Sequence, residues 1–432
     1  MTLFLDQSEP GFAAAFAALV DARRDEEADV RATVAEIVAA VRRQGDAALV
    51  ELTARLDRMH LDADRLRFTP AQIAAARESC TPELYEALVL AAERIRAFHA
   101  RQVPADASYV DERGVGLGLR WRPVDAVGLY VPGGTAAYPS SVLMNAIPAR
   151  VAGVGRLVMT VPTPDGVVNP LVLVAAELAG VDEIYRIGGA QAVAALAYGT
   201  ASIAPVDKIV GPGNAYVAEA KRQVFGRVGI DMIAGPSEIV VVAESGVDPG
   251  WVAIDLLSQA EHDERAQAIL VTDDAGFARA VGRAVEERLT RLERSAIART
   301  SWRDHGAMIV VEGIEAAAPL VDALAPEHLE LIGPGAERLA ERIRHAGAIF
   351  VGPFTPEVIG DYVGGPNHVL PTGRTARFAS GLAVFDFLKR TTILRCDAAG
   401  FAGLAPAASR LARAEGLEAH ALAVEQRLGS AA

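Results

Sequence analysis

From about residue 126 the chain alternates short apolar runs with longer helix-forming segments, and this alternation is what most constrains its fold. Four β-rich runs are each followed by a helical pattern: "AVGLYVPGG", "RLVMTVP", "EIYRIGG" and "KIVGPGN". Strands that alternate with helices require parallel crossover connections, which place helices on both faces of one sheet. The pattern therefore predicts a doubly wound α/β domain over residues 130–236.

A second series of the same kind begins at Ser237. Its predicted strands are "EIVVVAE", "QAILVTD", "AMIVVE" and "AIFVGP", and its predicted helices include "GWVAIDLLSQAEHD", "GFARAVGRAVEERLTRL", "PEHLELIG" and "AERLAERIRHAG". Apolar residues at three- and four-residue spacing also predict amphipathic helices over residues 29–101. We expect residues 29–129 and 237–381 to form one α/β domain, with an N-terminal helical extension over 1–28 and a helical tail over 382–432.

Size and charge restrict the class of protein. A chain of 432 residues exceeds the length at which one hydrophobic core stops growing, so more than one domain is expected. Acidic residues outnumber basic ones 55 to 42, and the net charge of −13 would repel nucleic acid and anionic membranes. No apolar run is long enough to span a bilayer, and Asp6 and Glu9 stand where a secretory signal would be basic. We expect a cytoplasmic protein that acts on small molecules, with no nucleic-acid or membrane partner.

Three loops that follow predicted strands of the first series are rich in glycine or small polar residues: "YVPGGTAAYPSS", "RIGGAQA" and "VGPGNAY". In open α/β sheets, ligands bind at the carboxyl ends of the strands, where glycine allows close approach and helix N-termini offer free N–H groups. A nucleotide would fit such loops. The dinucleotide fingerprint GxGxxG is missing after the first strand, and ordinary tight turns also explain the glycines.

The stretch "LLSQAEHDERA" combines an amide, an imidazole and three carboxylates. On a helix, Gln259 and His262 project from one face about 60° apart, which is a workable geometry for two ligands of one metal ion. Zinc takes imidazole nitrogen and carboxylate oxygen, usually from four ligands. For His262 by itself, a surface or core histidine is the commoner alternative. We interpret the three carboxylates as solvated or supporting groups.

The segments "APEHLEL" and "IGDYVGGPNHVLPT" supply further candidates. Glu327 and His328 could act as general bases in one site, because an imidazole and a buried carboxylate both accept protons near neutral pH. The alternative for this dipeptide is a capped helix start with two exposed polar residues. Asp361 lies in a loop of glycines and prolines that is costly to order unless something binds there. Four histidines stand beside carboxylates, glycines or helix ends, which favours a shared site: those at 262, 328, 368 and 420.

Taken together, these segments resemble the histidinol dehydrogenases. "GIDMIAGPSEIVVVAE", "DLLSQAEHD", "PEHLEL", "GDY…GPNHVLPT", "FLKR" and "EGLEAH" follow the order and separations of that family over nearly the whole chain. The resemblance implies two incomplete, doubly wound Rossmann-like α/β domains. It also implies a zinc-containing homodimer that uses NAD to oxidise L-histidinol through L-histidinal to L-histidine, the last step of histidine biosynthesis. One zinc ion per subunit and two NAD per turnover are expected.

The resemblance assigns a role to each candidate residue. Zinc would be held by Gln259, His262, Asp361 and His420, the last supplied by the C-terminal tail of the partner subunit. Glu327 would activate water, and His328 would be the general base. Substrate contact falls on the zinc ligands and His328, together with Ser237, His368 and Glu415. NAD contact falls on one residue of each glycine-rich loop: Tyr130, Gln191 and Asn214.

Two alternatives stand beside this interpretation. A paralogue with the same fold and zinc would act on another alcohol, such as a sulfonated diol, although His368 and Glu415 suit an imidazole and an ammonium group better than a sulfonate. A catalytically inactive binding or regulatory protein would not need the intact set of ligands and bases that this chain retains. Formation of NADH from L-histidinol, with and without a chelator, separates the three.

Overall fold

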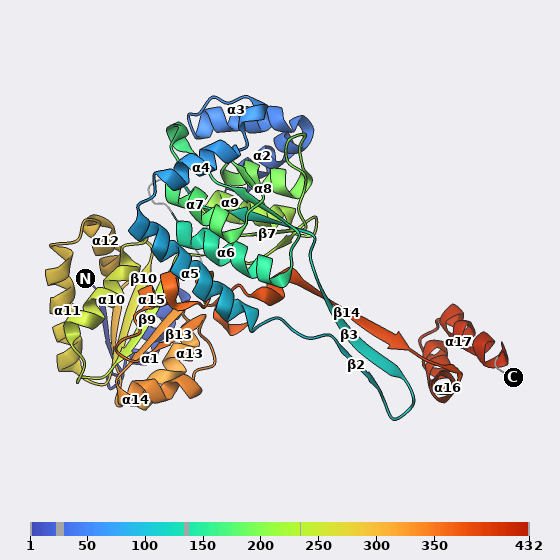
Figure 1. Ribbon diagram of the computed structural model, residues 1–432. Helices are drawn as coiled ribbons and strands as arrows, with labels where there is room; N and C mark the ends of the chain where they lie inside the picture. Colours follow the sequence, from blue (N-terminus) through green and yellow to red (C-terminus); the bar gives the residue numbers. More distant parts are fainter. Residues whose placement is uncertain (1, 23–29, 134–137, 234, 431–432) are drawn as a thin grey trace.

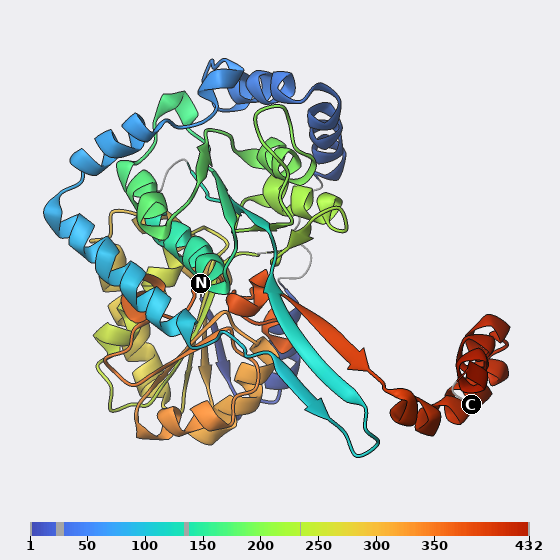
Figure 2. The same cartoon turned by 45° about the vertical axis from the view of Figure 1, so that its right-hand side comes forward.

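The computed structural model describes residues 2–22, 30–133, 138–233 and 235–430. Two parallel sheets form the body of the molecule, and an antiparallel arm projects from it (Figure 1 and Figure 2). The predicted α/β fold class is confirmed. The predicted boundary at residue 28 and residues 134–137 of the first glycine-rich loop lie outside the described residues.

The five-stranded sheet has the strand order β6-β5-β4-β7-β8, and its strands pair in parallel. The strands are β4 (Ala126–Tyr130), β5 (Arg156–Thr160), β6 (Glu183–Tyr185), β7 (Lys208–Val210) and β8 (Gly229–Ile230). The crossover helices are α6 (Pro139–Ala152), α7 (Pro170–Ala179), α8 (Gly189–Tyr198) and α9 (Ala215–Val224). Apolar cores cover both faces of this sheet, which is why its strands consist of nearly continuous apolar runs.

The six-stranded sheet has the order β1-β11-β10-β9-β12-β13, also parallel. Its strands are β1 (Leu3–Asp6), β9 (Glu238–Ala243), β10 (Gln267–Thr272), β11 (Ala307–Val310), β12 (His328–Ile332) and β13 (Ala348–Val351). Its helices are α1 (Phe12–Asp21), α10 (Pro249–Ala260), α11 (Ala275–Leu289), α12 (Ser295–His305), α13 (Ala317–Leu324), α14 (Pro334–Glu337) and α15 (Glu357–Ile359). With β1 set aside, the other five strands follow the same order as those of the five-stranded sheet.

Two predictions for the six-stranded sheet are wrong. The segment "PEHLELIG" is not helical, because residues 328–332 form β12 between β9 and β13. Its apolar residues alternate with His328 and Glu330, which is a strand period, but β12 lacks the continuous apolar run of the other buried strands although both polar side chains are buried. The N-terminal segment is more than a helical extension, because β1 pairs with β11 and α1 packs on the same core.

The helices that precede the five-stranded sheet pack on it rather than on the six-stranded sheet. They are α2 (Arg31–Gln44), α3 (Asp46–Leu56), α4 (Pro70–Glu78) and α5 (Pro82–Ala100). Val34 and Leu49 share one core with Val158 of β5, and Ile95 shares the other with Leu143 of α6. This packing differs from the predicted grouping of residues 29–129 with 237–381. Amphipathic spacing identifies the buried face of a helix but not the sheet that buries it.

The arm consists of three antiparallel strands, β2 (Ala107–Val110), β3 (Gly116–Pro123) and β14 (Leu388–Arg395). Because β14 pairs with β3 along its whole length, the predicted helical tail over 382–432 contains a strand before its helices. The helices α16 (Ala398–Ala414) and α17 (Glu418–Ser430) pack against each other at the tip of the arm (Figure 1 and Figure 2). Apolar side chains of the arm and of α16 are exposed in the single chain: Tyr109, Val110 and Leu394 on the arm and Leu411 on α16.

Candidate active site

The candidate catalytic residues gather at the amino ends of β9 and β12, in the middle of the six-stranded sheet. Ser237 directly precedes β9, and Glu327 directly precedes His328, the first residue of β12. His328 lies opposite Ile239 of β9 and Ala348 of β13. We expected ligands at the carboxyl ends of the strands, so this sheet departs from the general rule for open α/β folds.

The ring of His328 is buried and is fixed through one nitrogen. Its Nδ1 lies 3.0 Å from Gln259 Oε1, 3.2 Å from the carbonyl oxygen of Glu238 and 3.4 Å from Glu357 Oε1. All three atoms are acceptors, so Nδ1 carries a proton and donates it. Nε2 is buried, has no hydrogen-bond partner among the described residues and lies 3.6 Å from Asp361 Oδ1. Because Nδ1 is engaged, Nε2 is the ring nitrogen that faces Asp361 and can exchange a proton.

Glu327 lies beside this ring. Its Oε2 accepts a hydrogen bond from the backbone N–H of Glu238 at 3.0 Å and lies 3.8 Å from His328 Nδ1. Burial raises the pKa of Glu327 to about 7, against the opposing charge of His328 and the bond from Glu238. Burial by itself lowers the pKa of His328, but the charges of Glu357 and Glu327 outweigh it and hold the pKa well above its usual value. The pKa of Glu327 therefore lies in a range useful for acid–base catalysis.

Three predicted zinc ligands lie around the same ring. Gln259, near the end of α10, is fully buried, and its Nε2 donates to His262 Nδ1 at 3.1 Å. Asp361 lies in a π-helical turn, and its Oδ1 is buried without a hydrogen-bond partner in the described part of the chain. Donor atoms of His328, Glu357 and Asp361 lie within 4.8 Å of one another. An unpartnered carboxylate oxygen among amide and imidazole donors fits zinc.

Three carboxylates that the sequence pattern did not single out support this centre, two of them buried and one, Asp255, half-buried. Glu330 of β12 accepts the backbone N–H of Glu357 at 2.6 Å and is hydrogen-bonded to the carboxyl group of Asp255 on α10. Burial raises the pKa of Asp255 to about 6, that of Glu357 to about 8, and that of Glu330 well above its usual value. Glu357 stands four residues before Asp361, a spacing that could have revealed it. Nothing in "HLELI" marks Glu330 as buried.

The segment after Asp361 joins this centre to the five-stranded sheet. His368 Nδ1 donates to the carbonyl oxygen of Asp361 at 2.9 Å, and its Nε2 lies 3.4 Å from Ser141 Oγ. Asn367 Nδ2 donates to the carbonyl oxygen of Met144 at 2.6 Å. Ser141 and Met144 belong to the first two turns of α6, which follows the carboxyl end of β4. The amino end of one sheet therefore meets the carboxyl end of the other.

The carboxyl end of the five-stranded sheet carries the predicted nucleotide residues. Tyr130 ends β4, and its hydroxyl accepts a hydrogen bond from the N–H of Gly189 at 3.0 Å. Gln191, in the first turn of α8, is 1% exposed, and its Oε1 has no hydrogen-bond partner within the described ranges. Asn214 is the N-cap of α9, where its Oδ1 accepts N–H groups of the first turn. A buried, unpartnered amide oxygen beside two helix N-termini suits a ligand that offers hydroxyl groups and phosphates.

Two predicted residues lie away from both sites. Glu415 follows α16 and His420 lies in α17, at the tip of the arm (Figure 1). The other candidate residues of the six-stranded sheet come together within one chain, and His262 at their edge is exposed to solvent. If His420 is to reach the centre of a partner subunit, as predicted, it must lie away from the centre of its own chain. The centre must also be open to solvent on the side of His262.

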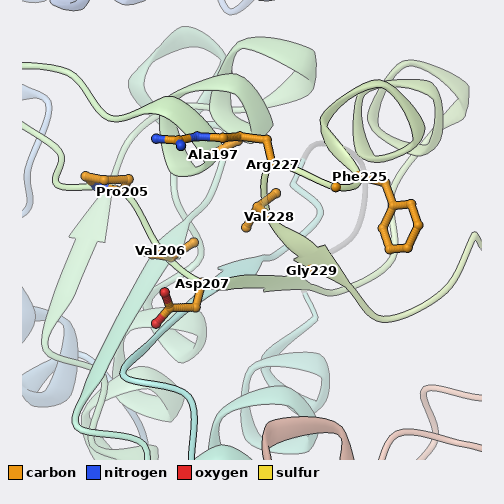
Figure 3. A pocket seen from close by; sticks show the side chains of 9 residues that line it. Ala197, Pro205, Val206, Asp207, Phe225, Arg227, Val228 and Gly229 are labelled. Atoms are coloured by element: carbon orange, nitrogen blue, oxygen red, sulfur yellow. The ribbon is translucent and has the colours of Figure 1, made fainter. Parts of the chain in front are cut away.

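A separate surface hollow of about 380 Å³ lies at the other end of the five-stranded sheet (Figure 3). Its lining comes from the segments before β7 and β8 and includes Asp207, Phe225 and Arg227. The carboxylate of Asp207 accepts the backbone N–H groups of Asp125 and Ala126 at 3.0 and 2.9 Å, so it supports the start of β4. The hollow contains none of the predicted residues and is not part of the candidate site.

The fold and the site define an α/β enzyme with two parallel sheets, in which a cluster of buried ionisable side chains meets a glycine-rich sheet edge. Comparison with known proteins identifies its kind. Residues 20–428 match the sequence profile of the family described as histidinol dehydrogenase, and the chain belongs to this family. It is therefore an oxidoreductase of histidine biosynthesis, as the sequence motifs predicted.

Individual relatives agree with this assignment. The histidinol dehydrogenase of Cereibacter sphaeroides is 65% identical over 99% of this chain and 99% of its own length. That of Ruegeria pomeroyi is 63% identical over the same shares of the two chains. The crystal structure of histidinol dehydrogenase from Elizabethkingia anophelis has a TM-score of 0.94 at 36% identity and covers 99% of this chain and 98% of that chain.

Proposed function

We propose that the protein oxidises L-histidinol to L-histidine through L-histidinal, as a cytoplasmic homodimer that uses two NAD per turnover and one zinc ion per subunit. The observation that carries the proposal is the position of His328 Nε2, a buried ring nitrogen 3.6 Å from Asp361 Oδ1 and able to exchange a proton there. The junction of the two sheets at His368 and Ser141 supports it, because a substrate held at one sheet lies next to a nucleotide held at the other.

The cofactor sites are those that the family resemblance assigns, and the donor sets described above support them. Gln259, His262 and Asp361 would hold zinc together with the partner subunit's His420. Tyr130, Gln191 and Asn214 would contact NAD. When bound, zinc orients the substrate without changing its oxidation state, and NAD accepts one hydride in each oxidation.

The side chains of this chain perform the proton transfers. His328 accepts the hydroxyl proton of the alcohol at Nε2, while the bonds of Nδ1 to Gln259 and the Glu238 carbonyl fix the ring. Glu327 then removes a proton from the water that adds to the aldehyde, a role that suits a carboxylate with a pKa of about 7. His328 accepts the hydroxyl proton of the aldehyde hydrate in the second oxidation.

Substrate contacts complete the site. Ser237, which precedes β9, and His368, which bridges to α6, would position the substrate, with Glu415 of the partner subunit near its ammonium group. The aldehyde stays bound between the two oxidations, which matters because a free aldehyde reacts with other amines. An intact set of these residues favours the histidinol substrate over a sulfonated alcohol.

Formation of NADH from L-histidinol tests the proposal directly. We expect two NADH per histidinol, loss of activity on treatment with a chelator and recovery on addition of zinc. Activity confined to other alcohols would instead support the paralogue with a different substrate. Tight binding of histidinol without NADH formation would support a binding or regulatory protein.

The exposed apolar arm and the open side of the metal centre support the shared active site. A mixture of His420→Ala and His328→Asn subunits tests it, because each heterodimer would then regain one complete site. Random reassortment would restore roughly a quarter of the wild-type activity, although neither variant is active by itself. No recovery after verified subunit exchange would show that each chain builds its site alone.

A further inference from the structure

One lysine of this chain is buried beside the predicted nucleotide site. Only three of the 42 basic residues are lysine, namely Lys208, Lys221 and Lys389, and the rest are arginine. The side chain of Lys221, on α9, is 3% exposed, and that of its ion-pair partner Asp231, which follows β8, is 1% exposed. A lysine in this position is informative because an ammonium is compact, whereas a guanidinium needs room for a planar fork of donors.

The ion pair holds a single residue, Gly211, from both sides. Asp231 Oδ2 accepts the backbone N–H of Gly211 at 2.7 Å, and Lys221 Nζ donates to the carbonyl oxygen of Gly211 at 3.0 Å. The backbone N–H of Asp231 in turn donates to the carbonyl oxygen of Ile209 in β7 at 3.2 Å. Both polar groups of Gly211 are therefore fixed by two charges that also bind each other.

Gly211 is the point at which the chain leaves β7 for the predicted nucleotide loop. Its φ is +112°, and a Cβ there would lie 2.1 Å from the carbonyl oxygen of Tyr130. Three residues later, Asn214 caps α9, the helix that carries Lys221. The pair thus fixes residues 211–214, a loop that begins against the carbonyl oxygen of Tyr130 and ends at Asn214. Tyr130 and Asn214 are two of the three residues assigned to NAD.

A buried ion pair is poor grounds for a stabilising role. Removing two charges from water costs several kcal/mol per ion, and an apolar pair of similar volume is often equally stable or more so. What an apolar pair cannot supply is a donor and an acceptor for the two backbone groups of Gly211.

We propose that Lys221 and Asp231 are positioning residues for NAD, which hold the loop over residues 211–214 in the conformation that binds the dinucleotide. This inference rests on the proposed use of NAD. Among the described residues, both side chains bond to each other and to Gly211 and make no hydrogen bond or ion pair with the substrate centre, so the effect is confined to the nucleotide.

Steady-state kinetics of Lys221→Met and of the double variant Lys221→Met/Asp231→Leu tests the proposal. We expect the KM for NAD to rise about tenfold or more in both, while the KM for histidinol and kcat at saturating NAD change less than twofold. The double variant should also recover the thermal midpoint that the single variant loses, because it leaves no unpaired charge. If the pair served stability alone, the double variant would recover the wild-type KM for NAD together with the thermal midpoint, and the proposal would be overturned. A double variant that does not fold would also overturn it.

Lys208→Met is the matched control. Lys208 lies at the start of β7 and pairs with Asp386, with its Nζ 2.6 Å from the Asp386 carbonyl oxygen, at the end of the strand away from the nucleotide loop. Its loss should leave the KM for NAD within twofold of the wild-type value, and an increase equal to that of Lys221→Met would overturn the proposal. Calorimetric titration of the wild-type protein and the variants with NAD separates a failure of the proposed function from a failure of the positioning role. Absence of NAD binding there would refute the proposed function, whereas equal NAD binding by wild type and variants would refute only the positioning role.

Discussion

The two parallel sheets share one strand order but present opposite ends to each other. The five-stranded sheet offers the carboxyl ends of its strands, where Tyr130, Gln191 and Asn214 lie in glycine-rich loops. The six-stranded sheet offers the amino ends of β9 and β12, where the side chains are mostly carboxylates and imidazoles. The same strand order therefore presents backbone groups of glycine-rich loops at the carboxyl end of one sheet and ionisable side chains at the amino end of the other.

Helix direction gives this difference a physical reason. In a parallel sheet, helices begin near the carboxyl ends of the strands and finish near the amino ends. The N-termini of α6, α8 and α9 carry partial positive charge, which favours the phosphates of a nucleotide. The C-terminus of α10, beside Gln259 and His262, carries partial negative charge, which favours a cation. An enzyme that binds a nucleotide next to a cation therefore gains when the carboxyl end of one sheet faces the amino end of the other.

The strongest test of this division is His328→Asn, which alters only the six-stranded side. Loss of the proton acceptor should lower the turnover of both histidinol and histidinal by roughly 10²- to 10⁴-fold, measured as NADH formation. NAD binding, measured by calorimetry, should stay within twofold of the wild-type value. A large loss of NAD affinity would mean that the two sheet edges do not act as separate sites.

Glu327→Gln should divide the chemistry within the six-stranded side. Without a carboxylate to activate water, the oxidation of histidinal should fall roughly 10²-fold, while the oxidation of histidinol should change only a few-fold. Because the pKa of Glu327 is raised to about 7, the wild-type rate of the second oxidation should increase as pH rises through that value. Rapid-quench measurement of each half-reaction gives both results. Equal losses in the two half-reactions would contradict separate roles for Glu327 and His328.

Tyr130→Phe makes the reciprocal change on the five-stranded side. It removes the acceptor of the Gly189 N–H, and a buried group left unpaired costs about 1–3 kcal/mol. The KM for NAD should rise several-fold and the thermal midpoint should fall by a few degrees. The KM for histidinol should not change, and a parallel rise in that constant would argue against separate edges.

Asp255→Asn should have the smallest effect and should appear only in stability. Burial raises the pKa of Asp255 from 3.8 to about 6, so the folded state binds more protons than the unfolded state between these values. Its contribution to stability is therefore fully present below about pH 4 and is lost as pH rises through 6. The variant should melt a few degrees higher than wild type at pH 8 and at the same temperature at pH 4. The exposed Asp273→Asn serves as control and should show no such difference.

Much of the fold could be predicted because its strands are continuous apolar runs. The strands β4, β9 and β10 are buried along their whole length, and polar residues, glycines or prolines next to them mark their ends. β12 could not be recognised in this way, because the buried Glu330 makes it look amphipathic. The arm escaped prediction because β3 is only half-buried and β14 is largely exposed. The two strands lie about 270 residues apart, and only tertiary pairing reveals them.

The candidate site was predicted in its composition rather than in its geometry. Family resemblance singled out Gln259 as a ligand, since spacing alone does not favour an amide. The placement of the site at the amino ends depends on where α10 finishes relative to β9 and β12, which no local pattern records. Glu357 and Asp255 reach the centre from segments about 100 residues apart. Their contribution depends on burial, and the sequence does not report burial for isolated carboxylates.

The late position of β14 has a consequence for synthesis of the chain. The hairpin of β2 and β3 is complete by residue 123, whereas its third strand ends at residue 395. At about 5–20 residues per second, the outer edge of β3 waits roughly 15–50 s on the ribosome for its neighbour. Arg120 and Arg122 are exposed on this strand, and such charges keep an open edge from pairing with other nascent chains. Of the three sheets, that of the arm is thus the last to be finished and the one that most needs protection while it waits.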